Sequence, residues 1–156
     1  MIYYMSLTVP TIIKRQVNWG DQAPYMHVNN SLFFRWMESS WATFLLESGT
    51  PELIQGNELN LILVSINCQF KKQVNFPDTI LITCELSDIQ HAFIIFKHQV
   101  WSSSEQALST HGESKVVLYD RQAEKIKTIT PHLRDLFSKH QLSGNKNVLE
   151  FLKGCL

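Results

Sequence analysis

The sequence has few cysteines, few glycines and no net charge, and each shortage excludes a class of protein. Its three cysteines, Cys68, Cys84 and Cys155, have the spacing of neither a disulfide framework nor a metal site, which indicates a reducing compartment. Six glycines without a Gly-rich loop exclude a nucleotide-cofactor motif. Basic and acidic side chains number 14 each, so nucleic acid is not an expected partner.

Long apolar runs are also missing. No stretch reaches the roughly 18 apolar residues of a membrane span, so none is expected. Residues 1–17 lack a secretory signal, although the absence of acidic residues together with Lys14 and Arg15 resembles a very short mitochondrial presequence. Because Ile12 to Trp19 already has the pattern of folded structure, we predict a cytoplasmic protein, with the mitochondrion as the alternative.

One helix dominates the first half of the chain. A strand is predicted over residues 11–19, ending at the Gly20-Asp21 turn. Asn29 or Asn30 then begins a long helix that ends near Gly49, which Pro51 follows as a stop signal. Large apolar side chains recur in this helix at steps of three and four residues, so the helix has a wide apolar face that other parts of the protein must cover.

The second half alternates apolar and polar residues, which is typical of strands. In the second predicted strand, for example, Val64, Ile66, Cys68 and Phe70 share one face. The predicted strands cover residues 62–70, 79–86, 91–101 and 114–119, and short amphipathic helices cover 131–140 and 147–156.

Together these elements predict an α+β fold. An antiparallel sheet of about five strands wraps around one long central helix, with short C-terminal helices. Residues 1–156 form a single domain, with a core over about 11–130 and a helical tail over 131–156. A single sheet has unpaired edges, so association of two copies is expected.

Polar residues are concentrated in segment 20–30, directly before the central helix. The free N–H groups at a helix N-terminus can hold a carbonyl oxygen and stabilise the negative charge that develops on attack. A nearby carboxylate or histidine then activates water or attacks directly, as in ester or thioester hydrolysis. The alternative is structural: Asn29 or Asn30 caps the helix, Gly20-Asp21 turns the chain, and His27 satisfies local backbone groups.

The same segment resembles a family signature. Its parts are Gly20-Asp21, Ala23, His27-Val28-Asn29-Asn30, Phe33-Phe34 and Glu38, followed downstream by residues 66–74 and 76–80. They are similar to the acyl-CoA thioesterases of the 4-hydroxybenzoyl-CoA thioesterase type, which have the hotdog fold. The resemblance covers roughly residues 11–137.

This resemblance implies hydrolysis of an acyl-CoA or related acyl thioester to free acid and thiol. It implies no metal and no cofactor beyond the coenzyme A thioester as substrate, and assembly as a homodimer or homotetramer. The family's catalytic carboxylate falls on Ala23, which has no reactive group. Catalysis is therefore assigned to Asp21, His27 or Glu38.

Substrate binding is expected at two places. The thioester oxygen would rest on N–H groups between Met26 and Asn30, including those of Val28 and Asn29. Lys71 and Lys72 would meet the phosphates of coenzyme A, unless they are solvated lysines that protect a sheet edge.

Two other readings of the same residues stay open. Ala23 favours a catalytically silent acyl-CoA-binding, acyl-binding or scaffold protein on the hotdog fold. His27 with Asp21 is compatible with a dehydratase of that fold.

Overall fold

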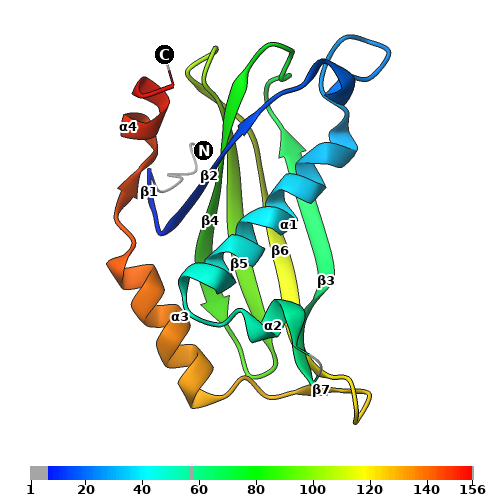
Figure 1. Cartoon of the computed structure of the whole chain (residues 1–156), viewed down its shortest axis with the longest axis vertical. Helices are drawn as coiled ribbons and strands as arrows, with labels where there is room; N and C mark the ends of the chain where they lie inside the picture. The colour runs from blue at the N-terminus through cyan, green and yellow to red at the C-terminus, as the bar shows by residue number, and fades with distance from the viewer. Residues whose placement is uncertain (1–6, 57, 156) are drawn as a thin grey trace.

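The computed structural model describes residues 7–56 and 58–155, in which a curved antiparallel sheet surrounds one long helix (Figure 1). The elements in chain order are β1 (Thr8–Val9), β2 (Thr11–Gln16), the 3-10 turn Trp19–Asp21, α1 (Asn30–Glu47), α2 (Glu52–Gln55), β3 (Leu59–Phe70), β4 (Thr79–Ile89), β5 (Phe93–Ser102), β6 (Ala107–Asp120), β7 (Lys125–Lys127), α3 (Pro131–Ser143), β8 (Lys146–Asn147) and α4 (Val148–Lys153). The predicted α+β architecture is confirmed.

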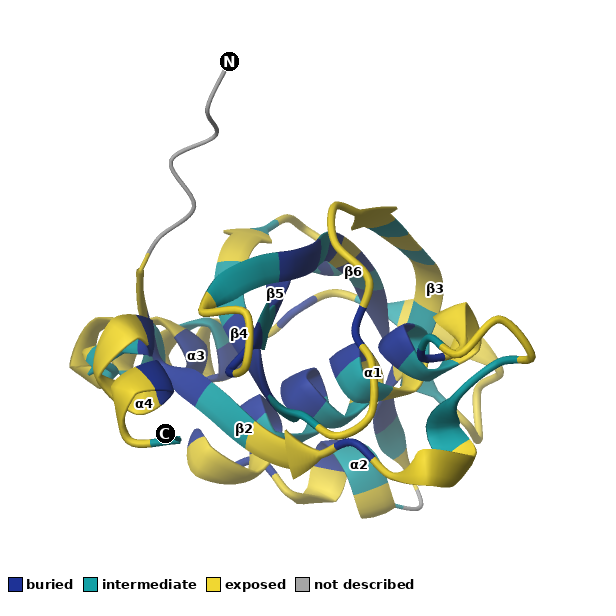
Figure 2. Cartoon of the chain, turned by 90° about the horizontal axis from the view of Figure 1, so that it is seen from above, coloured by how far each residue is buried: buried dark blue, intermediate teal, exposed yellow. Residues whose placement is uncertain are grey.

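The main sheet has the strand order β2-β4-β5-β6-β3, and β7 pairs with β6 as a sixth strand. All its pairs are antiparallel. Successive side chains of a strand point to opposite faces of the sheet, and the face towards α1 is mostly apolar, with the polar residues His98 and Ser114 buried among the apolar ones. Figure 2 shows α1 lying inside the curve of the sheet, against this apolar face.

Helix α1 begins and ends where its signals predict. The Asn29 side chain accepts a hydrogen bond from Ser31 N at 3.0 Å, and Gly49 takes a positive φ of 82° just after the helix. The side chains that α1 buries lie at helical spacing: Phe33, Met37, Ser40, Trp41, Phe44 and Leu45. None of the helices in the described ranges is long and apolar enough to cross a membrane.

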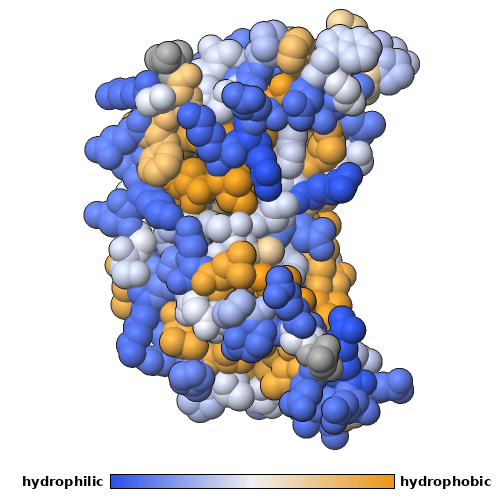
Figure 3. Space-filling model, viewed as in Figure 1, coloured by the Kyte–Doolittle hydropathy of each residue, from blue (hydrophilic) through white to orange (hydrophobic). Residues whose placement is uncertain are grey.

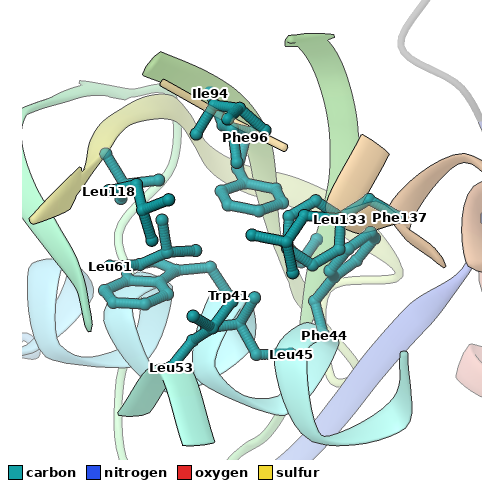
Figure 4. Packing of buried hydrophobic residues seen from close by; sticks show 13 residues of the cluster. Trp41, Phe44, Leu45, Leu53, Leu61, Ile94, Phe96, Leu118, Leu133 and Phe137 are labelled. Carbon is teal, nitrogen blue, oxygen red and sulfur yellow. The ribbon is translucent and has the colours of Figure 1, made fainter. Parts of the chain in front are cut away.

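The core beneath the sheet has two parts along α1. The part near the end of α1 is built around Phe44, whose ring lies 5.1 Å from Phe96 and 6.0 Å from Phe137 (Figure 4). The part near the start of α1 contains Phe33 and Met37. A third, smaller cluster lies where α4 packs on the sheet.

Some predicted details are wrong. The first strand ends at Gln16 rather than at residue 19, because the Asp21 carboxylate accepts a hydrogen bond from Asn18 N at 2.8 Å and draws the chain into a turn. The register of β3 shifts beside Val64, which is 55% exposed in the resulting bulge instead of sharing the inward face with Ile66. Elements α2 and β7 were not predicted, because they are too short to show a periodic pattern in the sequence. Residues 1–6 of the segment compared with a presequence lie outside the described residues.

The two edges of the sheet are treated differently. Strand β2 pairs with Thr79–Cys84 of β4, and the remaining part of β4, which β2 does not reach, is covered by α3. Arg134 on α3 donates from Nη1 to Ile89 O at 3.0 Å and from Nη2 to Gln90 O at 2.6 Å, while Gln141 Oε1 accepts from Leu86 N at 2.7 Å. Both end strands of the sheet, β2 and β3, pair along one side only among the described residues, and β3 is the longer of the two.

Candidate active site

The loop between β2 and α1 is a tight hairpin. Gln22 and Val28 form an antiparallel bridge, and Ala23 N donates to His27 O at 2.7 Å. Pro24 supplies the fixed φ of the first turn position, and Met26 completes the turn with a left-handed φ of 66°. The hairpin thereby brings His27 back beside the start of α1.

Hydrogen bonding leaves few N–H groups free at this helix start. The amides of Met26, Val28 and Asn29 donate to the carbonyls of Ala23 at 2.9 Å, Val74 at 2.8 Å and Asp21 at 2.9 Å, respectively. Within residues 7–56 and 58–155, the amides of His27 and Asn30 have no acceptor. A helix N-terminus stabilises negative charge, so these two are the donors available to an incoming oxygen.

A pocket of about 270 Å³ opens where the start of α1 meets the end of β3. Its lining consists of His27, Val28, Asn30, Phe33, Phe70, Lys71, Lys72, Gln73 and Val74. One wall is aromatic, because the Phe33 ring lies edge-on to Phe70 at 5.3 Å and to Trp36 at 5.0 Å. The pocket therefore combines an apolar wall with a basic rim.

The hydrogen bond of His27 fixes which ring nitrogen is free. Its Nδ1 lies 3.1 Å from Val28 O, and since a carbonyl only accepts, Nδ1 carries the proton. In the neutral ring with this tautomer the lone pair is on Nε2, and Nε2 has no partner among the described residues. The ring stacks on Tyr25 at 6.4 Å. A neutral imidazole of this tautomer has the chemistry of a general base towards water.

The two pocket lysines are held by the backbone of the last long strand. The amides of Lys71 and Lys72 both donate to Ser109 O, at 2.7 and 3.0 Å, and Ser109 Oγ donates back to Lys72 O at 2.7 Å. Lys72 Nζ also lies 3.4 Å from a Glu105 carboxylate oxygen. Burial lowers the pKa of His111, and the positive charge of Lys71 lowers it further.

The structure brings some predicted residues together and separates others. Those that line the pocket are His27, Val28, Asn30, Lys71 and Lys72. Met26 and Asn29 adjoin it in the chain without lining it. The Asp21 carboxylate is used by Asn18 N, and Glu38 is exposed on α1 outside the pocket. Nowhere in the described ranges do three His, Cys, Asp or Glu side chains gather as a metal site.

A buried polar group that sequence reasoning missed lies deeper along α1. His98 Nδ1 is 2.8 Å from Ser40 Oγ, and His98 Nε2 is 2.8 Å from Ser114 Oγ. Burial lowers the pKa of His98 to about 3, against a weaker opposing effect of the Thr83 backbone. The alternation of β5 does place His98 on the inward face with Phe96, which is the signal that could have located it.

A sheet curved around one helix in this order is the hotdog fold, and solved structures agree. The PA5185 protein from Pseudomonas aeruginosa superposes with a TM-score of 0.74 at 23% identity over 83% of this chain and 90% of its own. The gentisyl-coenzyme A thioesterase BH1999 gives 0.72 at 21% identity over 81% and 98%. Slr0204, a 1,4-dihydroxy-2-naphthoyl-CoA thioesterase from Synechocystis, gives 0.72 at 13% identity over 82% and 95%.

Sequence comparison identifies the family. The profile of the thioesterase-like superfamily matches residues 17–137, which include the whole hairpin, α1 and the long strands. This chain therefore belongs to the thioesterase-like superfamily. Among curated proteins, none matches its sequence.

Proposed function

We propose that this protein hydrolyses an acyl-CoA thioester to the free acid and coenzyme A. The observation that carries the proposal is one pocket that combines the unpartnered Nε2 of His27, the free amide of Asn30 and two lysines. Membership of the thioesterase-like superfamily supports the same reaction class.

The reaction proceeds through attack by water. His27 Nε2 takes a proton from water as its oxygen forms a bond to the thioester carbon. The amides of Asn30 and His27 stabilise the negative charge on the carbonyl oxygen. The C–S bond then breaks, and the proton on His27 passes to the thiolate of coenzyme A. Because Ala23 has no carboxylate, this route forms no acyl-enzyme intermediate.

Hydrolysis of acyl-CoAs by the wild type and by Ala23→Asp tests the proposal. We expect turnover by the wild type and a change of less than about tenfold in the variant, because His27 already supplies the base. The missing carboxylate favours a second candidate, a silent acyl-binding protein. A wild type that binds acyl-CoA without cleaving it, together with activity in Ala23→Asp, would contradict hydrolysis and support that candidate.

Coenzyme A phosphates are the expected ligands of the basic rim. Lys71→Ala and Lys72→Ala should each raise KM for acyl-CoA about three- to tenfold at low salt, with a smaller effect at high salt, since exposed charges are screened. Steady-state kinetics at two salt concentrations measure this. Lys115→Ala is the matched control, because Lys115 lies over the Phe93 ring on the outer face; an equal rise in that variant contradicts the assignment.

A second copy of the chain is the proposed protein partner. Strand β3, whose other side is unpaired among the described residues, carries the apolar residues Ile62 and Val64, which are 38% and 55% exposed. Figure 3 shows apolar surface along the border where β3 lies, interrupted by hydrophilic side chains. Pairing of two β3 edges would continue the sheet and cover this surface, and sedimentation equilibrium would then give twice the mass of 18.1 kDa.

A further inference from the structure

We propose that Glu105 is an internal competitor for the substrate: it holds Lys72 in the free protein and has to release this lysine before a phosphate of coenzyme A binds there. This inference rests on the proposed function and assigns a residue that sets the affinity of the basic rim. It follows from the different surroundings of the two pocket lysines, Lys71 and Lys72.

The two lysines differ in their ionic partners. Lys72 Nζ lies 3.4 Å from a carboxylate oxygen of Glu105, whereas Lys71 forms no ion pair within residues 7–56 and 58–155. Both lysines line the pocket, and Glu105 lies beside it without lining it. The rim of the free protein therefore presents one available positive charge and one that a carboxylate already balances.

The backbone is fixed on both sides of this ion pair. Lys71 N and Lys72 N both donate to the carbonyl of Ser109, which is fully buried. Glu105 N donates to Ser102 Oγ at 3.1 Å, and Ser102 is 1% exposed. The turn after β3 and the turn between β5 and β6 thus meet at one end of the sheet (Figure 1). The two side chains of the ion pair, which are 52% and 58% exposed, can separate while both backbones stay in place.

The charges decide how an incoming phosphate competes with Glu105. An exposed ion pair contributes little to stability, because water solvates both charges, so the pair opens readily. A phosphate monoester carries about 1.5 to 2 negative charges at pH 7, against one on the carboxylate, and coenzyme A holds such a group together with a pyrophosphate. Coulomb attraction to Lys72 therefore favours the ligand. Glu105 still weakens binding, because its attraction to Lys72 is given up and its free carboxylate then lies near the bound phosphates.

Competition makes the contributions of Lys72 and Glu105 interdependent. While Glu105 is present, replacing Lys72 removes the attraction to phosphate but also removes the ion pair that had to be broken, so the two effects offset each other in part. Without Glu105, nothing offsets the loss of Lys72, and the same replacement weakens binding more. Two residues that do not interact have additive effects instead.

Calorimetry with coenzyme A and the full chain tests this interdependence in the wild type, the two single variants and the double variant. At low salt, Glu105→Gln should bind coenzyme A about three- to fivefold more tightly than the wild type does. Lys72→Ala should weaken binding about threefold in the wild type and about tenfold in the Glu105→Gln background. Pantetheine, which has no phosphate, should bind all four proteins equally.

Asp135→Asn is the matched control. It removes the carboxylate of another exposed ion pair, in which Lys139 Nζ lies 2.9 Å from Asp135 on α3, and the Asp135 side chain is 58% exposed, as that of Glu105 is. Its affinity for coenzyme A should equal that of the wild type. The replaced side chains are all at least half exposed, so each variant should fold, and circular dichroism verifies this.

Additive effects of Lys72→Ala and Glu105→Gln would overturn the proposal, since Glu105 would then act on the ligand without involving Lys72. An unchanged affinity for coenzyme A in Glu105→Gln, an equal gain for pantetheine, or an equal gain in Asp135→Asn would overturn it as well. Coupled effects on binding without thioester cleavage would reject the proposed hydrolysis alone, whereas cleavage with additive effects would reject the competition alone.

Discussion

His27→Gln is expected to lower kcat by a factor of about 10²–10⁴, the usual contribution of a positioned general base. Glutamine keeps a side-chain N–H that can reach Val28 O, so the hairpin should be preserved, but it has no basic nitrogen to accept a proton from water. KM should change little, because the aromatic wall and the lysines remain. Steady-state kinetics with a hexanoyl or benzoyl thioester of coenzyme A measure both constants.

His111→Gln is the matched control for this prediction. His111 is a partly buried histidine of β6 near Lys71, and it does not line the pocket. Its variant should retain wild-type kcat. If His27→Gln loses less than about tenfold, the base lies elsewhere, and Asp21 and Glu38 are the carboxylates to replace next.

Acidification should destabilise the protein through His98. Burial holds the pKa of His98 at about 3 in the folded state, against 6.5 ordinarily. Between those values the unfolded chain binds a proton that the folded chain does not, so this contribution is complete above pH 6.5 and is lost as the pH falls towards 3. Over that interval the loss reaches about 5 kcal/mol, at about 1.4 kcal/mol per pH unit.

Urea unfolding between pH 7 and pH 4 measures this effect, with His98→Gln as the variant. The variant should be less stable at pH 7, yet its free energy of unfolding should fall less steeply with acid, by up to about 1.4 kcal/mol per pH unit. His132→Gln, which removes an exposed histidine of α3, should keep the wild-type slope. Parallel pH profiles for wild type and His98→Gln would show that His98 is not held neutral.

The sheet and its helix could be predicted because their signals are local. Asn29 and Gly49 mark the ends of α1, and the apolar residues at alternate positions Ile80, Ile82 and Cys84 mark β4. The bulge at Val64 could not be predicted, because an added residue in one strand becomes visible only against the register of its partner, β6. The Gly20-Asp21 turn could be predicted, but the end of the preceding strand at Gln16 could not, because Val17 and Trp19 continue its alternating pattern.

The site divides in the same way between local and distant contacts. Segment 20–30 could be singled out because its polar residues precede the helix directly. Its pocket also needs Phe70 and Val74, whose proximity depends on the β3 edge folding back over the start of α1. The contacts of His98 lie 58 residues away at Ser40 and 16 residues away at Ser114, and no periodic pattern connects such positions.

Because α3 covers the end of β4, this strand edge stays exposed during synthesis until α3 has been made. Gln141 accepts the hydrogen bond of Leu86 N across 55 residues, which a ribosome adds in roughly 3 to 11 seconds at about 5–20 residues per second. Until then the end of β4 is an open strand edge on the nascent chain. Termination of translation before α3 (Pro131–Ser143) is complete would therefore release a chain whose β4 edge can pair with other strands. A helix in the last sixth of the sequence thus protects a strand that is synthesised long before it.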